Sequence, residues 1–215
     1  MTYSVKEMFL SIQGEGAHTG RPSVFLRFSG CNLWSGREQD RAAAVCKFCD
    51  TEFVGFDGLG GGQFKTAQAL AEEVWSYWPK QEGEAWVICT GGEPLLQLDT
   101  ALIAALHKVG FKIGVETNGT IAAPAGIDWL CVSPKADAKL AQISGDELKL
   151  VYPQAENRPE DFTNLNFNVF SLQPMEDQSG NIEISDANKY AAFEYCIAHP
   201  KWRLSLQTHK YLGVR

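Results

Sequence analysis

Trp86-Val87-Ile88-Cys89-Thr90-Gly91-Gly92-Glu93-Pro94 joins a short apolar run to a polar segment that contains two adjacent glycines. A continuous apolar run of this length predicts a strand buried on both faces, as in parallel sheets covered by helices. The two glycines expose backbone that can approach a small polar ligand closely. The stretch therefore predicts an α/β sheet with a binding site at the end of this strand.

Outward from this stretch, strand patterns alternate with helical ones. Further strands are predicted over residues 23–28, 112–115, 129–132, 148–151, 168–172 and 202–206. Helices are predicted over residues 66–78, 98–109 and 187–199, followed by Pro79, Gly110 and Pro200. The glycine-rich run at 58–62 is interpreted as a flexible surface loop. The alternation predicts an α/β chain with a mainly parallel sheet.

Polar clusters follow six of the predicted strands. They comprise Cys31 and the segments 90–93, 116–119, 133–135, 173–176 and 207–210. Because parallel strands end at one edge of a sheet, we expect these clusters to meet there. The sequence thus predicts an incomplete, TIM-like β/α barrel of about six mainly parallel strands. Its active site would lie at the carboxyl ends of the strands.

Length and composition set further bounds. The 215 residues favour one domain spanning residues 1–215, and 45% hydrophobic with 21% charged residues are typical of a globular chain. A net charge of −7 argues against a nucleic-acid partner. The sequence shows no transmembrane-length apolar segment and no signal peptide, so no membrane association is expected. Six cysteines in such a chain indicate reduced thiols and a cytoplasmic location.

Cys31, Cys46 and Cys49 form the most informative cysteine set. Soft thiolates favour iron–sulfur clusters, and three ligands instead of four leave one iron open to a reacting molecule. The alternative is a structural zinc site completed by a histidine such as His18. The other three cysteines are interpreted as small hydrophobic residues of the core.

The cysteine set together with residues 90–94 resembles the radical S-adenosylmethionine (SAM) enzymes. More narrowly, the chain resembles the 7-carboxy-7-deazaguanine synthase family of queuosine and 7-deazapurine biosynthesis, a tRNA modification pathway. The similarity runs through residues 12–16, 27–33 and 207–211, and so covers nearly the whole chain. Fourteen residues separate Cys31 from Cys46, where radical SAM enzymes commonly have three. Residues 34–45 are therefore expected to form an insertion in the cluster-binding loop.

The resemblance implies a [4Fe–4S] cluster on Cys31, Cys46 and Cys49, with SAM bound directly to it. It also implies SAM contacts from the cluster motif and from segments that follow three strands: Phe48, Cys49, Asp50, Gly92, Ser133, Pro134, Lys135, Gln173, Pro174, Met175 and Glu176. Glu93 has two equally good interpretations: a residue of the binding site, or a carboxylate that stabilises the start of a helix.

The substrate implied by the resemblance is 6-carboxy-5,6,7,8-tetrahydropterin. Its contacts would come from Ile12, Gln13, Gly14, Glu15, Arg27, Thr90 and Glu116, with His209 as a further candidate. Arg27 is a lone charge in an apolar strand, and its fork of donors suits a carboxylate or a pterin; an ordinary ion pair is the alternative. The resemblance also implies that the Thr51 hydroxyl helps to hold Mg²⁺, which prefers oxygen ligands.

The implied activity is that of a carbon–nitrogen lyase whose chemistry resides in cluster-bound SAM and in no catalytic side chain. A 5′-deoxyadenosyl radical would take a hydrogen from C6 of the pterin, the ring would contract, ammonia would leave, and SAM would be regenerated. A flavodoxin-like or ferredoxin-like electron donor and a homodimer are family expectations. The alternative function is an activating enzyme that makes a glycyl radical on a partner protein. A zinc-stabilised binding module is a more distant alternative.

Overall fold

The computed structural model describes residues 2–79 and 82–215, and its strands form one sheet. The strands are β1 (Tyr3–Ile12), β2 (Pro22–Phe28), β3 (Gly62–Phe64), β4 (Ala85–Gly91), β5 (Phe111–Thr117), β6 (Trp129–Val132), β7 (Ser144–Tyr152), β8 (Asn166–Pro174) and β9 (Trp202–Leu204). The α-helices are α1 (Ala67–Ser76), α2 (Thr100–Val109), α3 (Ile182–Ala198) and α4 (Thr208–Leu212). Short 3₁₀ helices cover Gly16–His18, Glu38–Ala43, Pro94–Leu96 and Pro159–Phe162.

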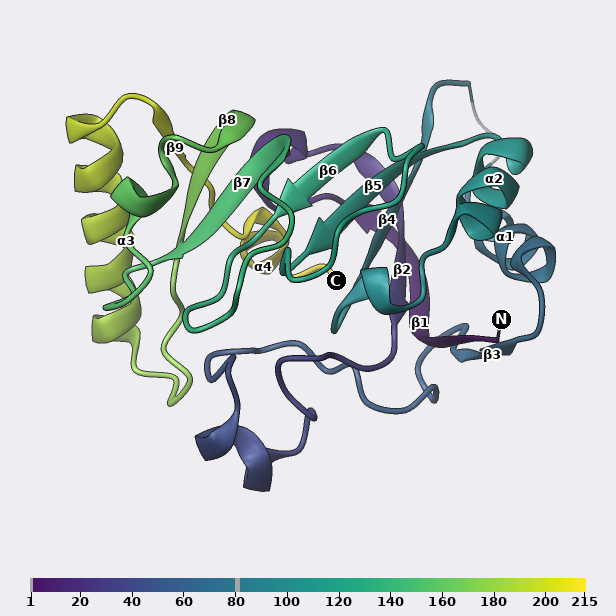
Figure 1. Ribbon diagram of the computed structural model, residues 1–215, viewed down its shortest axis with the longest axis horizontal. Helices are drawn as coiled ribbons and strands as arrows, with labels where there is room; N and C mark the ends of the chain where they lie inside the picture. The colour runs from purple at the N-terminus through teal and green to yellow at the C-terminus, as the bar shows by residue number, and fades with distance from the viewer. Residues whose placement is uncertain (1, 80–81) are drawn as a thin grey trace.

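The predicted, mainly parallel sheet is confirmed. Within the described chain the strand order is β3-β1-β2-β4-β5-β6-β7-β8-β9, and β2 and β4 to β9 run parallel. There are thus seven parallel strands in this part of the chain, one more than the approximate prediction. The strands β3 and β9 form the two edges of the sheet, so the barrel is open. Figure 1 shows α1 and α2 at one end of this sheet and α3 at the other.

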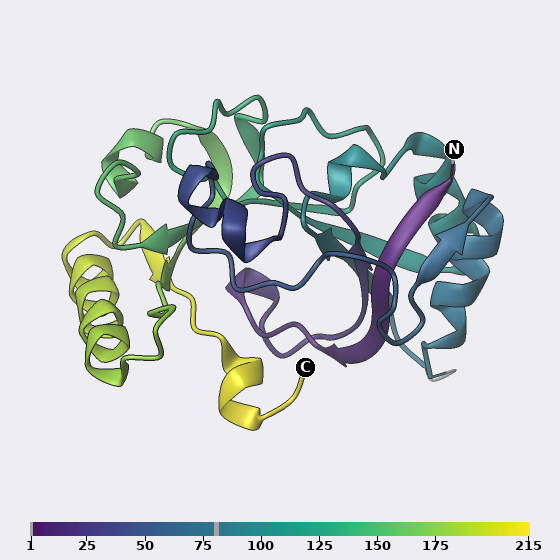
Figure 2. The same cartoon turned by 90° about the horizontal axis from the view of Figure 1, so that it is seen from below.

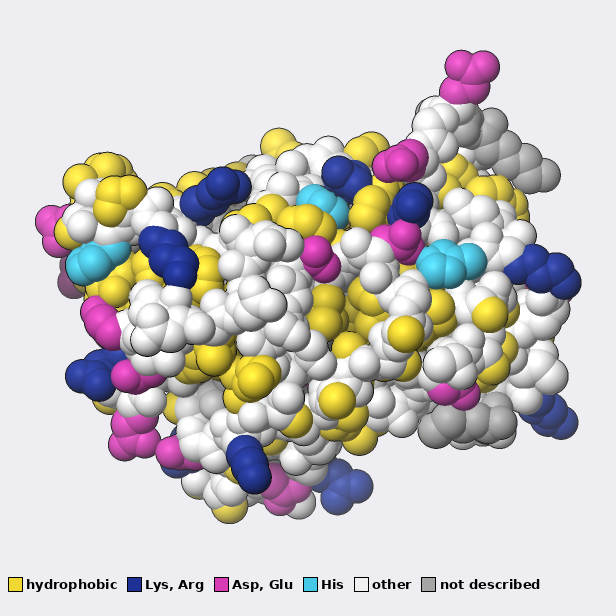
Figure 3. All heavy atoms as spheres, turned by 45° about the horizontal axis from the view of Figure 1, so that its top comes forward, with side chains coloured by type: hydrophobic (Ala, Val, Ile, Leu, Met, Phe, Trp, Pro, Cys, Tyr) yellow, Lys and Arg dark blue, Asp and Glu magenta, His cyan; other side chains and the backbone are white. Residues whose placement is uncertain are grey.

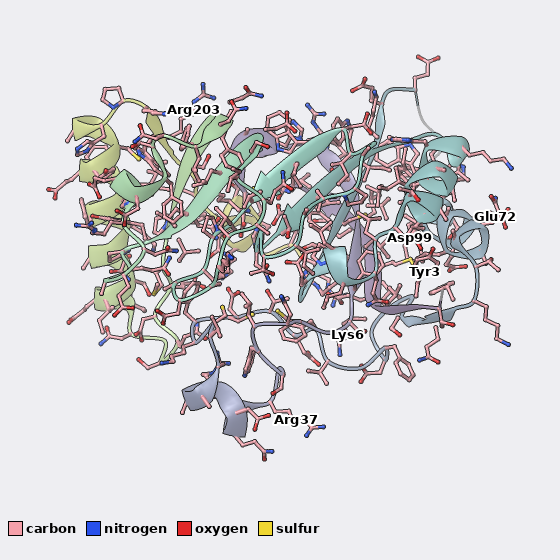
Figure 4. The ribbon with its side chains drawn as sticks, viewed as in Figure 1. Tyr3, Lys6, Arg37, Glu72, Asp99 and Arg203 are labelled. Atoms are coloured by element: carbon pink, nitrogen blue, oxygen red, sulfur yellow. The ribbon has the colours of Figure 1, made fainter. Side chains whose placement is uncertain are left out.

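Two helices pack against the first half of the sheet and form much of the core. Leu70 and Val74 of α1 and Leu102 and Leu106 of α2 are fully buried in the same apolar cluster as the strands. Burying side chains of this size stabilises the fold by about 1.5–3 kcal/mol each. The start of α2 is fixed separately, because the phenol of Tyr3 in β1 donates to the N-cap Asp99 at 2.8 Å. Figure 4 shows these two residues close together.

The surface carries charges of both signs. On the face shown in Figure 3, Lys and Arg side chains are interspersed with Asp and Glu side chains. No helix within residues 2–79 and 82–215 combines the length and apolar character needed to cross a membrane.

The strands β1 and β3 have no counterpart among the predicted strands. A register shift in the β1–β2 pairing falls between Val5 and Glu7 and interrupts the alternation that marks a strand in sequence. Both Val5 and Met8 are consequently buried although they are an odd number of residues apart. The helix α3 also starts earlier than predicted, at Ile182, because the Asn181 side chain caps its first turn.

The predicted surface loop is present at 58–61, while Gly62 begins β3, and the loop packs closely on β1. Gly58 donates its backbone N–H to the carbonyl of Lys6, and the carbonyl of Leu59 accepts from Met8 at 2.7 Å. A Cβ atom added to Gly61 would lie 2.4 Å from the Lys6 carbonyl oxygen and 2.5 Å from that of Phe56. These glycines are therefore required because the segment packs backbone to backbone on β1.

We predict that Gly61→Ala destabilises the protein by about 1–3 kcal/mol, because fixed backbone atoms must move to admit the methyl group. Gly62→Ala is the matched control, since the nearest atom to its added Cβ is 3.7 Å away in the Phe64 ring. Urea unfolding followed by tryptophan fluorescence measures the difference. Equal free energies of unfolding for the two variants would contradict the packing argument.

Candidate active site

A cavity of about 460 Å³ opens at the carboxyl ends of the parallel strands. This volume is within the range of small-molecule sites. All of the predicted site residues line it except two, Cys31 and Pro134. Pro134 is buried beside the cavity, where its carbonyl accepts a hydrogen bond from Asn157. The predicted position of the site at the strand ends therefore agrees with the structure.

Two of the three predicted cluster cysteines line the cavity, and the third lies outside its lining. Cys46 and Cys49 line it, and both thiols are free. Cys31 is half-buried and sits behind Gly92, whose added Cβ would lie 2.8 Å from the Cβ of Cys31. A hydrogen bond from Cys46 lowers the pKa of the Cys49 thiol to about 6, which favours the thiolate form that binds metals.

The alternative zinc ligand lies elsewhere. The ring of His18 packs 4.2 Å from the Trp129 ring and 5.0 Å from the Trp86 ring, measured between centroids. Within the described chain, no three His, Cys, Asp or Glu side chains are gathered closely enough to hold one metal ion.

The segment after β4 is held by Glu93, which is buried. Its carboxylate accepts hydrogen bonds from the backbone of Leu95 and Asn118 and from the hydroxyl of Thr117. The helix-start alternative for Glu93 is thus the arrangement that the structure shows. Burial raises the pKa of Glu93, while these three bonds favour its ionised form.

Residues 34–45 form a lobe that stands off the sheet, as Figures 1 and 2 show from two directions. Inside this lobe the guanidinium of Arg41 lies 4.1 Å from the centroid of the Trp34 ring. Its Nη1 donates to the carbonyls of Lys47 and Cys49 at 2.9 and 3.1 Å, and its Nε donates to Glu38. Hydrogen bonds from Arg41 of the insertion therefore hold the turn that carries the second and third cysteines.

All of the predicted SAM contacts except Pro134 line the same cavity as Cys46 and Cys49. Lys135 Nζ donates to Ser133 Oγ at 2.6 Å and lies 6.0 Å from the ring centroid of Phe48. Burial lowers the pKa of Lys135. Gln173 Oε1 is buried and has no hydrogen-bond partner among the described residues, so it can accept a hydrogen bond from a ligand.

At the predicted substrate end, Arg27 Nε donates to Glu7 Oε1 at 2.9 Å. The ion-pair alternative for Arg27 is therefore realised, although the pair lines the cavity. Gly14 is closely covered by His209, since an added Cβ would lie 2.0 Å from the His209 ring nitrogen. Position 14 therefore requires a glycine for close packing against His209, in addition to the backbone contact with the substrate that the resemblance implies.

Lys149 and Lys210 line the cavity although neither was predicted as a SAM or substrate contact. Lys149 lies in β7 and contacts Glu15 and Glu116. A lone lysine in an apolar strand is the same signal that singled out Arg27, and it could have identified Lys149. Lys210 in α4 contacts Asp50 and Glu176, and so joins two segments predicted to bind SAM.

We predict that Arg41→Met lowers the iron content of protein reconstituted with iron and sulfide, because the Cys46–Cys49 turn loses its tether. Arg37→Met is the matched control on the same lobe, since Figure 4 shows Arg37 on its outer side and its side chain is exposed. Colorimetric iron analysis and the absorbance of the cluster measure the effect. Equal iron in the two variants would contradict a tethering role.

No protein-family model matches the chain. A 7-carboxy-7-deazaguanine synthase from Caulobacter vibrioides is 62% identical over 214 residues, a match that covers all of both chains. A protein of the same name from Burkholderia multivorans is 56% identical, again over the full length of both. A crystal structure of QueE from Escherichia coli superimposes with a TM-score of 0.72 and 26% identity, covering 97% of this chain and 95% of that one. The chain therefore belongs to the 7-carboxy-7-deazaguanine synthase family of radical SAM enzymes.

Proposed function

We propose that this chain is a carbon–nitrogen lyase that converts 6-carboxy-5,6,7,8-tetrahydropterin to 7-carboxy-7-deazaguanine and ammonia. The observation that carries the proposal is one cavity where the cysteine motif, the glycine pair and the polar edge at 12–15 meet. The names of the relatives support the product. The substrate contains the atoms of the product plus ammonia, so the reaction needs no net oxidation. A radical initiator can therefore be returned at the end, which is consistent with catalytic use of SAM.

The cysteine end of the cavity fits a [4Fe–4S] cluster that carries SAM. Three free thiols, Cys31, Cys46 and Cys49, suit iron, and the absence of a Cβ at Gly92 lets its backbone lie directly against Cys31. The unpaired Gln173 oxygen fits a donor such as the adenine amino group. When bound, the cluster and SAM would supply the 5′-deoxyadenosyl radical that removes a hydrogen from C6.

The side chains of the protein would bind and orient the reactants. Lys135 supplies a cation, beside Ser133, for the carboxylate of SAM, and Phe48 offers a ring face for adenine. Arg27 is held by Glu7 through Nε alone, so its remaining N–H groups can reach the pterin or its carboxylate. Thr51 lines the same cavity and would give a hydroxyl oxygen to Mg²⁺ near that carboxylate.

We also propose a setting for this activity. The enzyme would act in the cytoplasm, where reduced thiols and an oxygen-sensitive cluster persist. A flavodoxin-like or ferredoxin-like protein would supply the electron, and the enzyme would work as a homodimer. Its product would enter the pathway to queuosine in tRNA.

The direct test is anaerobic turnover. Reconstituted protein would be mixed with dithionite, SAM, Mg²⁺ and 6-carboxytetrahydropterin, and the products analysed by mass spectrometry. We expect the deazapurine, with several product molecules formed per SAM. Cleavage of SAM without this product would contradict the proposed substrate and favour an activating enzyme that acts on a protein partner.

We predict that Cys31→Ala abolishes both cluster assembly and product formation, because two thiolates cannot replace three as ligands. Cys196→Ala is the control, since Cys196 is a free cysteine in α3 that does not line the cavity. Iron analysis and product yield give the two readouts. Wild-type turnover in Cys31→Ala would exclude Cys31 as a cluster ligand.

We predict that Thr51→Ala weakens the response of product formation to added Mg²⁺, because the protein hydroxyl ligand is lost. Thr51→Ser keeps the hydroxyl and should keep the response. Titration of turnover with MgCl₂ after treatment with a chelator measures both. The same Mg²⁺ dependence in Thr51→Ala as in the wild type would remove Thr51 from the metal site.

A further inference from the structure

Lys149 is a buried lysine that lines the active-site cavity, in the interior strand β7. Its side chain is only 5% exposed, and its Nζ donates to Glu15 Oε2 and, at 3.2 Å, to Glu116 Oε2. A buried lysine is stable in its charged form only when such partners surround it. Two carboxylates and one ammonium thus form a buried triad with one net negative charge.

The two carboxylates of this triad differ in how much hydrogen-bond acceptor capacity remains free for a ligand. Glu15 accepts from Lys149 at one oxygen and from Gln173 and Gln207 at the other, at 3.2 and 2.9 Å. Its side chain is 16% exposed, and both oxygens are engaged. Glu116 accepts from Lys149 and from Gln13 at 2.8 Å, one partner per oxygen, and is 24% exposed. Glu116 therefore retains the acceptor capacity that a ligand can use.

A pterin presents an amino group next to a ring N–H, which are two donors side by side. An ionised carboxylate accepts hydrogen bonds from both donors. A protonated carboxyl group instead places its own O–H donor opposite one of the pterin N–H donors, so one hydrogen bond is lost. Recognition of this edge therefore depends on the charge state of Glu116.

The titratable groups around Lys149 come from several elements. Glu15 lies after β1, Glu116 in β5 and Cys131 in β6, while Lys135 follows β6 and Glu147 lies in β7 itself. His209 of α4 packs against Gly14, the residue before Glu15.

Burial opposes the charged form of Lys149, but the charges of Glu116 and Glu15 raise the pKa of its ammonium well above the usual value. Burial likewise opposes ionisation of Glu15, yet the charge and hydrogen bond of Lys149 lower the pKa of Glu15 to about 2. Burial also raises the pKa of Cys131, so this thiol stays neutral. Lys149 is therefore the cation that balances the two carboxylates.

We propose that Lys149 is a positioning residue that keeps Glu116 ionised, with Glu15 as its fixed counter-ion, so that Glu116 can accept the paired N–H donors of the pterin. This inference rests on the proposed substrate class. It assigns Glu15 to holding Lys149 and leaves the direct contact with the pterin to Glu116.

The test measures equilibrium binding of 6-carboxypterin, a stable fluorescent probe, to reconstituted protein with SAM between pH about 6 and about 7.5. Lys149→Met leaves the neighbouring carboxylates Glu15 and Glu116 without a cation, so that as the pH falls the pair takes up a shared proton, which Glu116 cannot hold while it accepts both pterin donors. We expect binding about tenfold or more weaker than wild type at the acid end, with the deficit shrinking as the pH rises. Lys149→Arg keeps the charge and should retain most of the affinity.

Two double variants identify the titrating group. Lys149→Met with Glu15→Gln leaves one carboxylate, Glu116, and should recover binding at the acid end. Lys149→Met with Glu116→Gln should bind weakly at every pH. A deficit in Lys149→Met that is absent, or that has the same size at every pH, would overturn the proposal, as would a failure of the Glu15→Gln change to restore binding.

The outcomes also separate this inference from the proposed function. If wild-type protein does not bind 6-carboxypterin, the proposed substrate class itself is wrong. If wild type binds the probe and the Lys149 variants match it, only the role of Lys149 is wrong.

Discussion

The close backbone contact between Gly91 and Gly92 after β4 and residues 28–30 after β2 is the constraint on which the active site depends. A Cβ at Gly91 would lie 2.3 Å from the Phe28 carbonyl oxygen, and one at Gly92 would lie 2.1 Å from that of Gly30. Contacts below 3 Å are sterically impossible, so any other residue would force the two segments apart. Because Cys31 follows directly, this approach places the first cysteine against the glycine pair. The glycines thus have a packing role besides the ligand contact that the family resemblance implies.

Glu93 extends that contact to the next strand. Its backbone N–H donates to the Gly30 carbonyl at 2.9 Å, and its carboxylate accepts from Thr117 and Asn118 at the end of β5. Asn118 in turn donates to the side chain of Asn32, beside the first cysteine. An unpaired buried carboxylate would be costly, and three hydrogen bonds make this one stable. The ends of β2, β4 and β5 are thereby joined through a single buried residue, by its backbone on one side and its side chain on the other.

The sequence was sufficient for the parallel sheet and for the position of the cavity at the strand ends, because each rests on local pattern. It was insufficient where a residue is explained by its neighbours in space. Lys149 sits in an apolar run, and only the folded chain shows that Glu15 and Glu116 surround it. The bulge in β1 hid a strand, and the glycines at 58–62 were taken for flexibility although they allow close packing. Arg27 lines the cavity, but its pairing with Glu7 could be found only from the antiparallel register of β1 and β2.

The insertion between Cys31 and Cys46 illustrates how a local departure is compensated. Lengthening a loop from three to fourteen residues is about two doublings, which costs only about 1.2 kcal/mol of closure entropy. A cation over an aromatic ring contributes about 0.5–2 kcal/mol, and hydrogen bonds from a charged donor contribute about 1.5–3 kcal/mol each. The contacts of Arg41 with Trp34 and with the carbonyls of Lys47 and Cys49 are therefore large enough to offset the added length. The longer loop can hold its two cysteines as firmly as a short one because it carries its own tether.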